Sequence, residues 1–216
     1  MQRLFAEGLG TAILLIGVVG SGIMGEALSG GNIGLALLIN AIATGCALYV
    51  IITTLGPISG AHFNPVVTLA FLLRAEISSR EALAYIGMQI TGGIIGVWAV
   101  HVMFDTQIIQ AATTTRAGWP QWFSEMLATF GLLFAIFGGL KSRPDAVPTL
   151  VAVYITGAYF FTSSTSFANP AVTIARAFTD TFAGIAPPHV PMFIVMQMAG
   201  FALAMIVLPS LFPDDD

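Results

Sequence analysis

The sequence predicts an all-α integral membrane protein, with six transmembrane helices and two re-entrant half-helices arranged as an inverted repeat. Three observations predict this fold. The 216 residues are 56% hydrophobic and only 8% charged, whereas soluble domains carry about 25% charged residues. Several apolar stretches approach the roughly 20 residues that a helix needs to cross the hydrocarbon. A short motif, Asn-Pro-x-Val-Thr-x-Ala, occurs twice. The lipid bilayer is therefore the expected surrounding of the chain.

Six stretches are interpreted as spanning helices. In chain order they are Leu4–Met24, Ile33–Leu55, Ala82–Phe104, Trp122–Leu140, Val147–Phe161 and Val190–Phe212. The fifth is short, and the semi-polar stretch Thr162–Ser166 is a candidate extension of it. All six are apolar around the whole helix, which is not the pattern of a short helix facing water. The alternating segments of about 10 residues that typify a transmembrane β-barrel do not occur in the sequence.

Two further apolar stretches, Asn64–Leu73 and Asn169–Phe178, are too short to span. Each follows a loop rich in small residues. Irregular backbone at membrane depth must be buried in protein or line a watery cavity. Both stretches are therefore predicted to be re-entrant half-helices.

The chain contains an internal repeat. Residues 64–70 and 169–175 agree at five of seven positions, and a Glu-x-x-x-Thr pattern begins at Glu7 and again at Glu125. Each half holds three spans, so the second half is inverted relative to the first. An inverted repeat places equivalent sites near the membrane midplane. We expect one channel domain over residues 1–216, with repeats at about 1–110 and 119–216.

The two Asn-Pro pairs explain how such a repeat could form a pore. Pro65 and Pro170 suit the first position of a helix, where the missing N–H has no partner to lose, and Asn64 and Asn169 are good N-caps. Two helix N-termini that face each other concentrate positive potential, roughly half a charge each. This arrangement repels cations and protons, while the amide NH₂ groups can donate to a passing neutral solute.

These motifs resemble those of the aquaporin family, the major intrinsic proteins, over nearly the whole chain. The resemblance is carried by Glu7-x-x-x-Thr11, Ser59-Gly60-Ala61-His62-Phe63-Asn64-Pro65-Val66, Glu125-x-x-x-Thr129 and Asn169-Pro170-Ala171. It implies a right-handed bundle, a homotetramer with one pore per subunit, and a passive channel for small uncharged solutes.

The resemblance also assigns residues to the pore. Two loops are expected to offer backbone carbonyls to the solute; their residues are Gly60, Ala61, His62 and Phe63 in the first, and Thr165, Ser166, Phe167 and Ala168 in the second. Glu7 and Glu125 are expected to support these loops by accepting hydrogen bonds, although a proton relay is the alternative for buried carboxylates. His62 is expected to line or support the cytoplasmic side of the pore, with a pH gate as the alternative.

The narrowest part of the pore departs from the family's usual pattern. Val66 replaces an alanine in the first motif, and Val172 stands where most members have arginine. By spacing from the two asparagines, the selectivity filter is predicted at Thr44, Gly157, Ser166 and Val172. This set has no arginine and no aromatic residue, which predicts a wide, uncharged neck that admits water, glycerol, urea or undissociated arsenous acid.

Val172 and the nearby Arg176 bear on which solutes and ions this neck admits. A valine at this position resembles bacterial members associated with arsenical resistance, which points to arsenite as cargo. Arg176 lies one turn beyond Val172, where it could restore positive charge to the outer vestibule or extend to the membrane interface as a structural residue.

The basic residues predict the orientation. With the N-terminus inside, five lie on the cytoplasmic side, namely Arg3, Arg74, Arg80, Lys141 and Arg143, and only Arg116 and Arg176 lie outside. This satisfies the positive-inside rule. A multi-pass protein of the cell (inner or plasma) membrane with both termini cytoplasmic is expected.

The sequence leaves functional classes other than a channel open. A secondary transporter with broken helices and a non-conducting structural tetramer both remain alternatives. An enzyme is not expected because no nucleophile–base pair is found, and neither a metal nor a cofactor is expected because no His/Cys/Asp/Glu cluster has ligand spacing. The net charge of −4 gives no basis for nucleic-acid binding.

Overall fold

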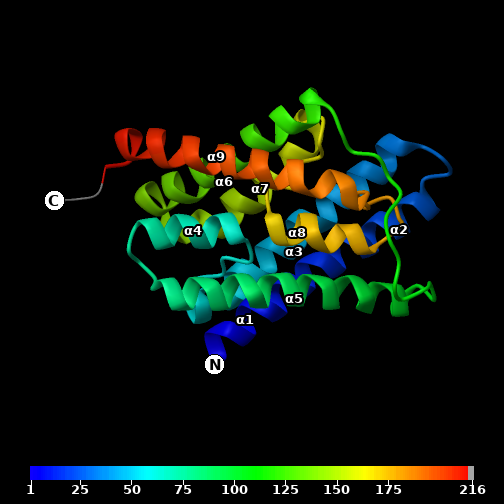
Figure 1. The fold of residues 1–216 in the computed structure, drawn as a ribbon, viewed down its shortest axis with the longest axis horizontal. Helices are drawn as coiled ribbons and strands as arrows, with labels where there is room; N and C mark the ends of the chain where they lie inside the picture. The colour runs from blue at the N-terminus through cyan, green and yellow to red at the C-terminus, as the bar shows by residue number, and fades with distance from the viewer. Residues whose placement is uncertain (214–216) are drawn as a thin grey trace.

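The computed structural model describes residues 1–213, and every regular element within them is a helix (Figure 1). The first half contains α1 (Gln2–Leu15), a π-helical turn (Ile16–Gly20), α2 (Ser21–Leu28), α3 (Ile33–Ser59), α4 (Pro65–Leu73) and α5 (Ser79–Met103). The second half contains α6 (Trp119–Ser142), α7 (Val147–Phe161), α8 (Pro170–Ala175) and α9 (Val190–Leu211). Short 3₁₀ turns cover Pro144–Ala146, Arg176–Phe178 and Pro187–His189. Both half-helices begin at the predicted residues.

Five helical segments are long and apolar enough to cross a membrane. They are Gln2–Leu28, Ile33–Ser59, Ser79–Met103, Trp119–Ser142 and Pro187–Leu211. The predicted fifth span, α7, has only 15 residues, about 22 Å of helix. Its proposed extension over Thr162–Ser166 is wrong, because Thr162 leaves the helix with an extended backbone (ψ 140°). These residues instead form the loop that leads to α8.

The first span is not a uniform α-helix. Residues Ile16–Gly20 form a π-helical turn between α1 and α2, and such turns often occur at functional sites. The side-chain amide of Asn40 on α3 donates to the carbonyl of Val18, 2.7 Å away, and to Ser21 Oγ at 2.8 Å. This contact fixes the turn where Val18 reaches the central cavity.

Glycines allow the long helices of each half to cross closely. A Cβ added at Gly92 on α5 would collide with the backbone of Gly8 on α1, and one at Gly200 on α9 would collide with the carbonyl of Met126 on α6. Close backbone approach through small residues is the usual way that helices pack in membranes. The two crossings hold α1 against α5 and α6 against α9.

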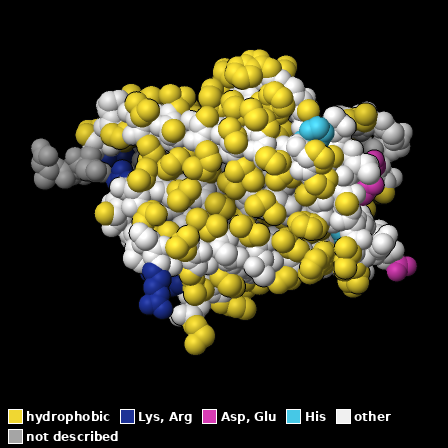
Figure 2. All heavy atoms as spheres, viewed as in Figure 1, with side chains coloured by type: hydrophobic (Ala, Val, Ile, Leu, Met, Phe, Trp, Pro, Cys, Tyr) yellow, Lys and Arg dark blue, Asp and Glu magenta, His cyan; other side chains and the backbone are white. Residues whose placement is uncertain are grey.

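The outer surface is that of a protein surrounded by lipid. Apolar side chains cover the middle of the visible face, while Lys and Arg gather toward the end at which α9 finishes and Asp and Glu toward the opposite end (Figures 1 and 2). Large apolar residues point outward along the spans; examples are Val153, Val195 and Ile206, which are 66%, 54% and 76% exposed.

Candidate pore

The half-helices α4 and α8 begin with the same cap. The side chain of Asn64 accepts a hydrogen bond from the backbone N–H of Val66 at 2.9 Å. Asn169 accepts in the same way from Ala171 at 2.9 Å and from Val172 at 3.3 Å. Because a proline follows each asparagine, each helix starts abruptly.

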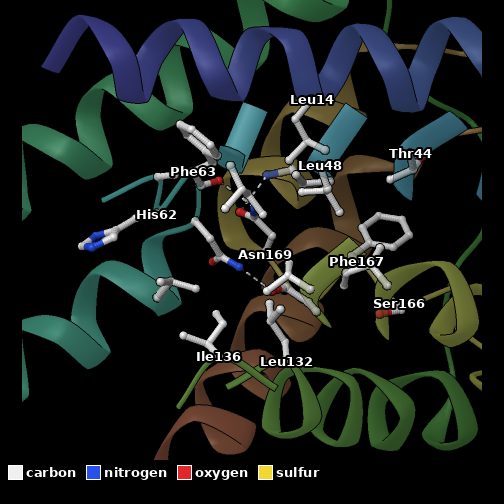
Figure 3. A pocket seen from close by; sticks show the side chains of 18 of the residues that line it. Leu14, Thr44, Leu48, His62, Phe63, Leu132, Ile136, Ser166, Phe167 and Asn169 are labelled. Atoms are coloured by element: carbon white, nitrogen blue, oxygen red, sulfur yellow. Dashed lines mark hydrogen bonds between the residues drawn. The ribbon is translucent and has the colours of Figure 1, made fainter. Parts of the chain in front are cut away.

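The two caps are joined by crossed hydrogen bonds. The amide of Asn64 donates to the carbonyl of Ala168, and that of Asn169 donates to the carbonyl of Phe63; both distances are 2.8 Å (dashed lines in Figure 3). Each asparagine therefore uses its oxygen to cap its own helix and one N–H to hold the opposite loop. The second N–H of each amide remains for a solute in the cavity.

The loops before the half-helices have an unusual backbone that repeats between the halves. Ala61 and Phe63 have positive φ angles of 53° and 47°, and the equivalent Ser166 and Ala168 have 50° and 46°. Thr165 adds a fifth such residue at 64°. None of these is glycine, so each costs roughly 1–2 kcal/mol of conformational strain. Strain of this kind persists only where neighbouring contacts fix the backbone.

Glu7 provides those contacts for the first loop. It is fully buried, and its carboxylate accepts hydrogen bonds from Ser59 Oγ at 2.7 Å, from the N–H of His62 at 3.0 Å and from the N–H of Phe63 at 2.8 Å. Gln89 Nε2 donates to the same carboxylate at 2.8 Å and to Thr68 Oγ1 at 2.9 Å. The carboxylate thus joins α1, α5, the loop and α4.

Glu125 holds the second loop with the same geometry. It accepts from the N–H groups of Phe167 and Ala168, both at 2.9 Å, and from Gln197 Nε2 at 2.7 Å. Gln197 also donates to Thr173 Oγ1 at 2.8 Å, as Gln89 does to the equivalent threonine. The expected hydrogen bonds from both loops to the two glutamates are present. Since these carboxylates are occupied by donors of the protein itself, the supporting interpretation suits them better than a relay.

A cavity of about 120 Å³ passes through the meeting point of the half-helices, which is room for several water molecules in sequence. Figure 3 shows His62 at one end, Asn169 in the middle, and Thr44, Ser166 and Phe167 at the other end. One wall is polar and consists of the two loops with their asparagines. The other wall is apolar, and its residues are Leu14, Val18, Leu48, Ile52, Val67, Phe71, Leu132, Ile136, Leu140, Val147, Val151 and Ile155.

The end of the cavity opposite His62 contains Val172 and three polar side chains, those of Thr44, Tyr159 and Ser166. Thr44 Oγ1 lies 3.1 Å from the hydroxyl of Tyr159, so the two form a hydrogen bond across the neck. The hydroxyl of Ser166 is buried and has no hydrogen-bond partner within the described chain, yet Ser166 lines the cavity. It can therefore bond to a passing solute. Val172 contributes an apolar, uncharged surface.

Comparison with known proteins decides the family. Residues 1–165 match the model of the major intrinsic protein family. The chain belongs to this family.

Individual members of the family agree with that assignment. The chain is 47% identical to aquaglyceroporin AqpS of Rhizobium meliloti over 207 residues, which covers 96% of this chain and 88% of AqpS. It is 29% identical to Aquaporin-5 of Ovis aries, over 82% of this chain and 71% of that protein.

The fold has a solved counterpart. The X-ray structure of the aquaglyceroporin from Plasmodium falciparum superposes with a TM-score of 0.74, covering 98% of both chains at 16% identity. That likeness confirms the predicted aquaporin fold. As a major intrinsic protein, the chain is a multi-pass membrane channel for small uncharged solutes and not an enzyme.

The prediction is wrong for one residue of the selectivity filter. Gly157 does not line the cavity within the described structure; an added Cβ there would meet the ring of Phe161 at 3.4 Å. Tyr159 takes the place instead, because the face of α7 turned to the cavity carries Val151, Ile155 and Tyr159 at intervals of four residues. Residue 157 is two positions away and lies on another face. The neck therefore contains an aromatic ring that the spacing rule did not predict.

The remaining predicted site residues divide into two groups. Those that line the cavity are Thr44, Gly60, Ala61, His62, Phe63, Asn64, Ser166, Phe167, Ala168, Asn169 and Val172. Pro65, Val66, Pro170 and Ala171 are buried in the half-helices behind the polar wall, and Thr165 is half-buried in the second loop. These residues shape the pore through the backbone and do not border the cavity.

His62 lines the end of the cavity opposite Thr44 and Ser166 (Figure 3). Its ring stacks on Phe71 with centroids 4.6 Å apart, and Nδ1 lies 3.2 Å from Thr68 Oγ1. Tyr85 contacts it edge-on at 5.4 Å. Three neighbours thus fix the imidazole, which fits the lining or supporting role better than a mobile gate.

Two residues of the pore were not assigned by sequence reasoning. Tyr159 carried a signal, because it continues a four-residue spacing of bulky residues on α7. Arg176 was left between two interpretations, and the structure places it at the cavity: it is only 2% exposed and lines the cavity beside Phe167.

Proposed function

We propose that this chain conducts water, glycerol and similarly small, neutral, hydroxylated solutes, through a pore that runs between Asn64 and Asn169. The observation that carries the proposal is the crossed pair of asparagine–carbonyl hydrogen bonds inside a continuous cavity. That arrangement leaves donors and carbonyl acceptors along one wall and an apolar surface along the other. A solute with several hydroxyl groups can exchange hydrogen bonds along such a wall without being held tightly.

Charged species are disfavoured at the centre of the pore. The N-termini of α4 and α8 face each other there, and each contributes partial positive charge. Asn64 and Asn169 both present donors, so a chain of water molecules is interrupted in its donor–acceptor direction. Protons and cations are therefore expected to be excluded.

The outer neck supports solutes larger than water. Its four contributing side chains are Thr44, Tyr159, Ser166 and Val172, none of which is charged. The Thr44 and Ser166 hydroxyls can bond to a polyol, while Val172 leaves space that an arginine side chain would fill. Undissociated arsenous acid and urea share these properties of small size, neutrality and hydrogen bonding, and we include them among the proposed solutes. Tyr159 narrows the neck relative to the sequence-based expectation.

The proposed topology has both termini on the cytoplasmic side of the cell membrane. In support, Arg3 pairs with Glu81 at 2.6 Å, which places the N-terminus beside the start of α5, and basic side chains gather at this end of the molecule (Figure 2). A homotetramer with one pore per subunit is proposed on the resemblance to the family. The extensive outward-facing apolar surface is compatible with both lipid and neighbouring subunits.

Val172 gives the decisive test. Wild type, Val172→Arg and Val172→Leu would be reconstituted in liposomes, and volume changes followed by stopped-flow light scattering under impermeant, glycerol and urea gradients. We expect fast glycerol entry in the wild type, strong loss in Val172→Arg, and a smaller loss in Val172→Leu, which adds bulk without charge. Flux should rise linearly with the gradient.

Three results would count against the proposal. Saturable flux would indicate a transporter, and no flux of water or solute would indicate a structural protein. Rapid water flow without glycerol entry would leave the channel function intact but refute the proposed range of solutes. The ring of Tyr159 would then be the group that makes the neck too narrow for glycerol.

A further inference from the structure

Val172 carries no charge, but the positively charged side chain of Arg176 lies nearby. This residue follows Val172 by four positions, about 6 Å further along the axis of α8, at the start of the 3₁₀ turn that follows the half-helix. Its side chain is buried and lines the cavity. The guanidinium carbon lies 3.4 Å from the centroid of the Phe167 ring, and Nε donates to the carbonyl of Ala183. The backbone carbonyl of Arg176 also accepts from the N–H of Ile185 at 3.2 Å.

A second guanidinium lies over the same ring. The Arg116 guanidinium carbon is 5.2 Å from the Phe167 centroid. Arg116 Nε donates to the carbonyl of Gly184 at 2.8 Å and Nη2 to that of Phe182 at 3.3 Å. The two arginines therefore tie residues 179–186, the outer loop between the two 3₁₀ turns that follow α8, to Phe167, which lies at the end of the cavity opposite His62 (Figure 3).

Within the part of the chain that the structure describes, neither Arg116 nor Arg176 forms an ion pair with a carboxylate. Glu125 attracts both guanidinium groups electrostatically but pairs directly with neither. Asp180, in the same outer loop, is exposed and accepts hydrogen bonds from Thr113 N and Oγ1, both at 2.8 Å. Glu125 is buried and accepts from loop amides and Gln197. The carbonyl oxygens of Phe182, Ala183 and Gly184 accept hydrogen bonds from the two guanidinium groups but carry no formal charge, so both positive charges stay in place.

A cation that enters from outside meets these charges before it reaches the uncharged neck. Buried charges are poorly screened by salt, and charges near a narrow aqueous passage raise the barrier for ions of the same sign. A neutral solute does not encounter this barrier. Because Arg176 is stacked flat against Phe167, it holds its charge beside the passage while the position at Val172 stays open.

We propose that Arg176, supported by Arg116, forms a second cation barrier in this pore, additional to the facing N-termini of α4 and α8 and displaced one helical turn outward from the position of Val172. Size selection and charge exclusion are then performed by different residues. Thr44, Tyr159, Ser166 and Val172 set the size of the neck, and Arg176 excludes cations at its outer mouth. This inference rests on the proposed channel function and adds a specificity-determining residue to it.

The experiment measures cation leak and glycerol entry on the same proteoliposome preparations. Leak of K⁺ and H⁺ is followed with potential- and pH-sensitive dyes, and glycerol entry by light scattering. The variants are Arg176→Gln, which removes the charge, Arg176→Lys, which keeps it, and Arg116→Gln. Arg143→Gln is the matched control, because Arg143 is an exposed arginine at the other end of the molecule.

We expect Arg176→Gln to raise cation leak by about tenfold while glycerol entry stays near the wild-type rate. Arg176→Lys should keep the low leak, Arg116→Gln should raise it less, and Arg143→Gln should leave it unchanged. The double variant Val172→Arg/Arg176→Gln should return to low leak, because it restores a charge at the neck.

Unchanged leak in Arg176→Gln together with normal glycerol entry would overturn the proposal and leave the channel function intact. Absence of glycerol entry in the wild type would instead refute the channel function itself. If Arg176→Gln does not assemble, Arg116→Gln and Arg176→Lys decide: equal leak in wild type and Arg116→Gln, or high leak in Arg176→Lys, would contradict the barrier.

Discussion

Replacing Glu7 by glutamine preserves the size of the side chain but removes the carboxylate that fixes the first pore loop. That carboxylate accepts four hydrogen bonds, from Ser59 Oγ, His62 N, Phe63 N and Gln89 Nε2. A glutamine has one acceptor oxygen, so its NH₂ group must face donors in place of the other oxygen. About two of the four bonds are lost.

The magnitude follows from the type of bond. Hydrogen bonds to charged groups contribute about 1.5–3 kcal/mol each, so losing two costs roughly 3–6 kcal/mol. For a chain of this size each kcal/mol shifts the melting temperature by about 2–4 °C, which predicts a decrease of roughly 6–24 °C. The carboxylate would no longer hold the N–H groups of His62 and Phe63. The strained backbone at Ala61 and Phe63, where φ is positive, should therefore relax.

The assay is thermal unfolding of the purified protein in detergent, combined with water permeability in liposomes. Glu7→Gln should melt early and conduct poorly. The control is Glu76→Gln, which affects only an exposed pair with Arg74 and should shift melting by less than about 2 °C. A melting temperature and permeability for Glu7→Gln equal to those of the control would refute the supporting role of the carboxylate.

Three further predictions concern packing, the neck and the outer loop. Gly92→Val should destabilise the fold by at least about 3 kcal/mol, because its Cβ collides with the backbone of α1. Gly87→Ala is the control, because a Cβ at this position meets open space, and it should stabilise the fold by about 0.4–1 kcal/mol. Thermal unfolding measures both variants. Tyr159→Phe should cost about 1 kcal/mol through the lost bond to α3 and raise the ratio of glycerol to water permeability; an unchanged ratio would exclude the hydroxyl from the neck. The backbone and hydroxyl hydrogen bonds from Thr113 hold the pKa of Asp180 below its ordinary value of 3.8, so this contact stabilises the folded state above that value and is lost as pH falls through the lowered pKa. The protection of the Thr113 amide against hydrogen exchange, taken relative to its intrinsic exchange rate at each pH, should therefore fall on acidification below that value, and an Asp180→Asn variant should lack that dependence.

Most of the architecture could be predicted from the sequence because membrane constraints are strong. Apolar length fixed the spans to within a few residues, and the paired Asn-Pro motifs located the starts of α4 and α8. The expectation that Glu7 and Glu125 accept hydrogen bonds from the loops came from the resemblance to the family, and both sets of hydrogen bonds are present in the structure. The spans and the helix starts rest on local rules that tertiary packing does not change.

The neck could not be derived in the same way. Its residues come from different helices, and the position of α7 relative to the cavity depends on where that helix ends and on how its loop turns. Thr162 ends α7, and Tyr159 rather than Gly157 faces the cavity. The position of Arg176 likewise depends on contacts with Phe167 and Ala183, which are separate in sequence and meet only in the folded chain.

The crossed asparagine–carbonyl bonds also set an order of events during synthesis. Asn64 is bonded to Ala168, 104 positions later, and Phe63 to Asn169, 106 positions later. At about 5–20 residues per second, the ribosome needs roughly 5–20 s to make the intervening chain. During that interval the first half-helix lacks the partner that ties its N-terminus at the midplane. The first half of the repeat therefore reaches its final form only after the second half has entered the membrane. Formation of the crossed hydrogen bonds then completes the pore as the last step of folding.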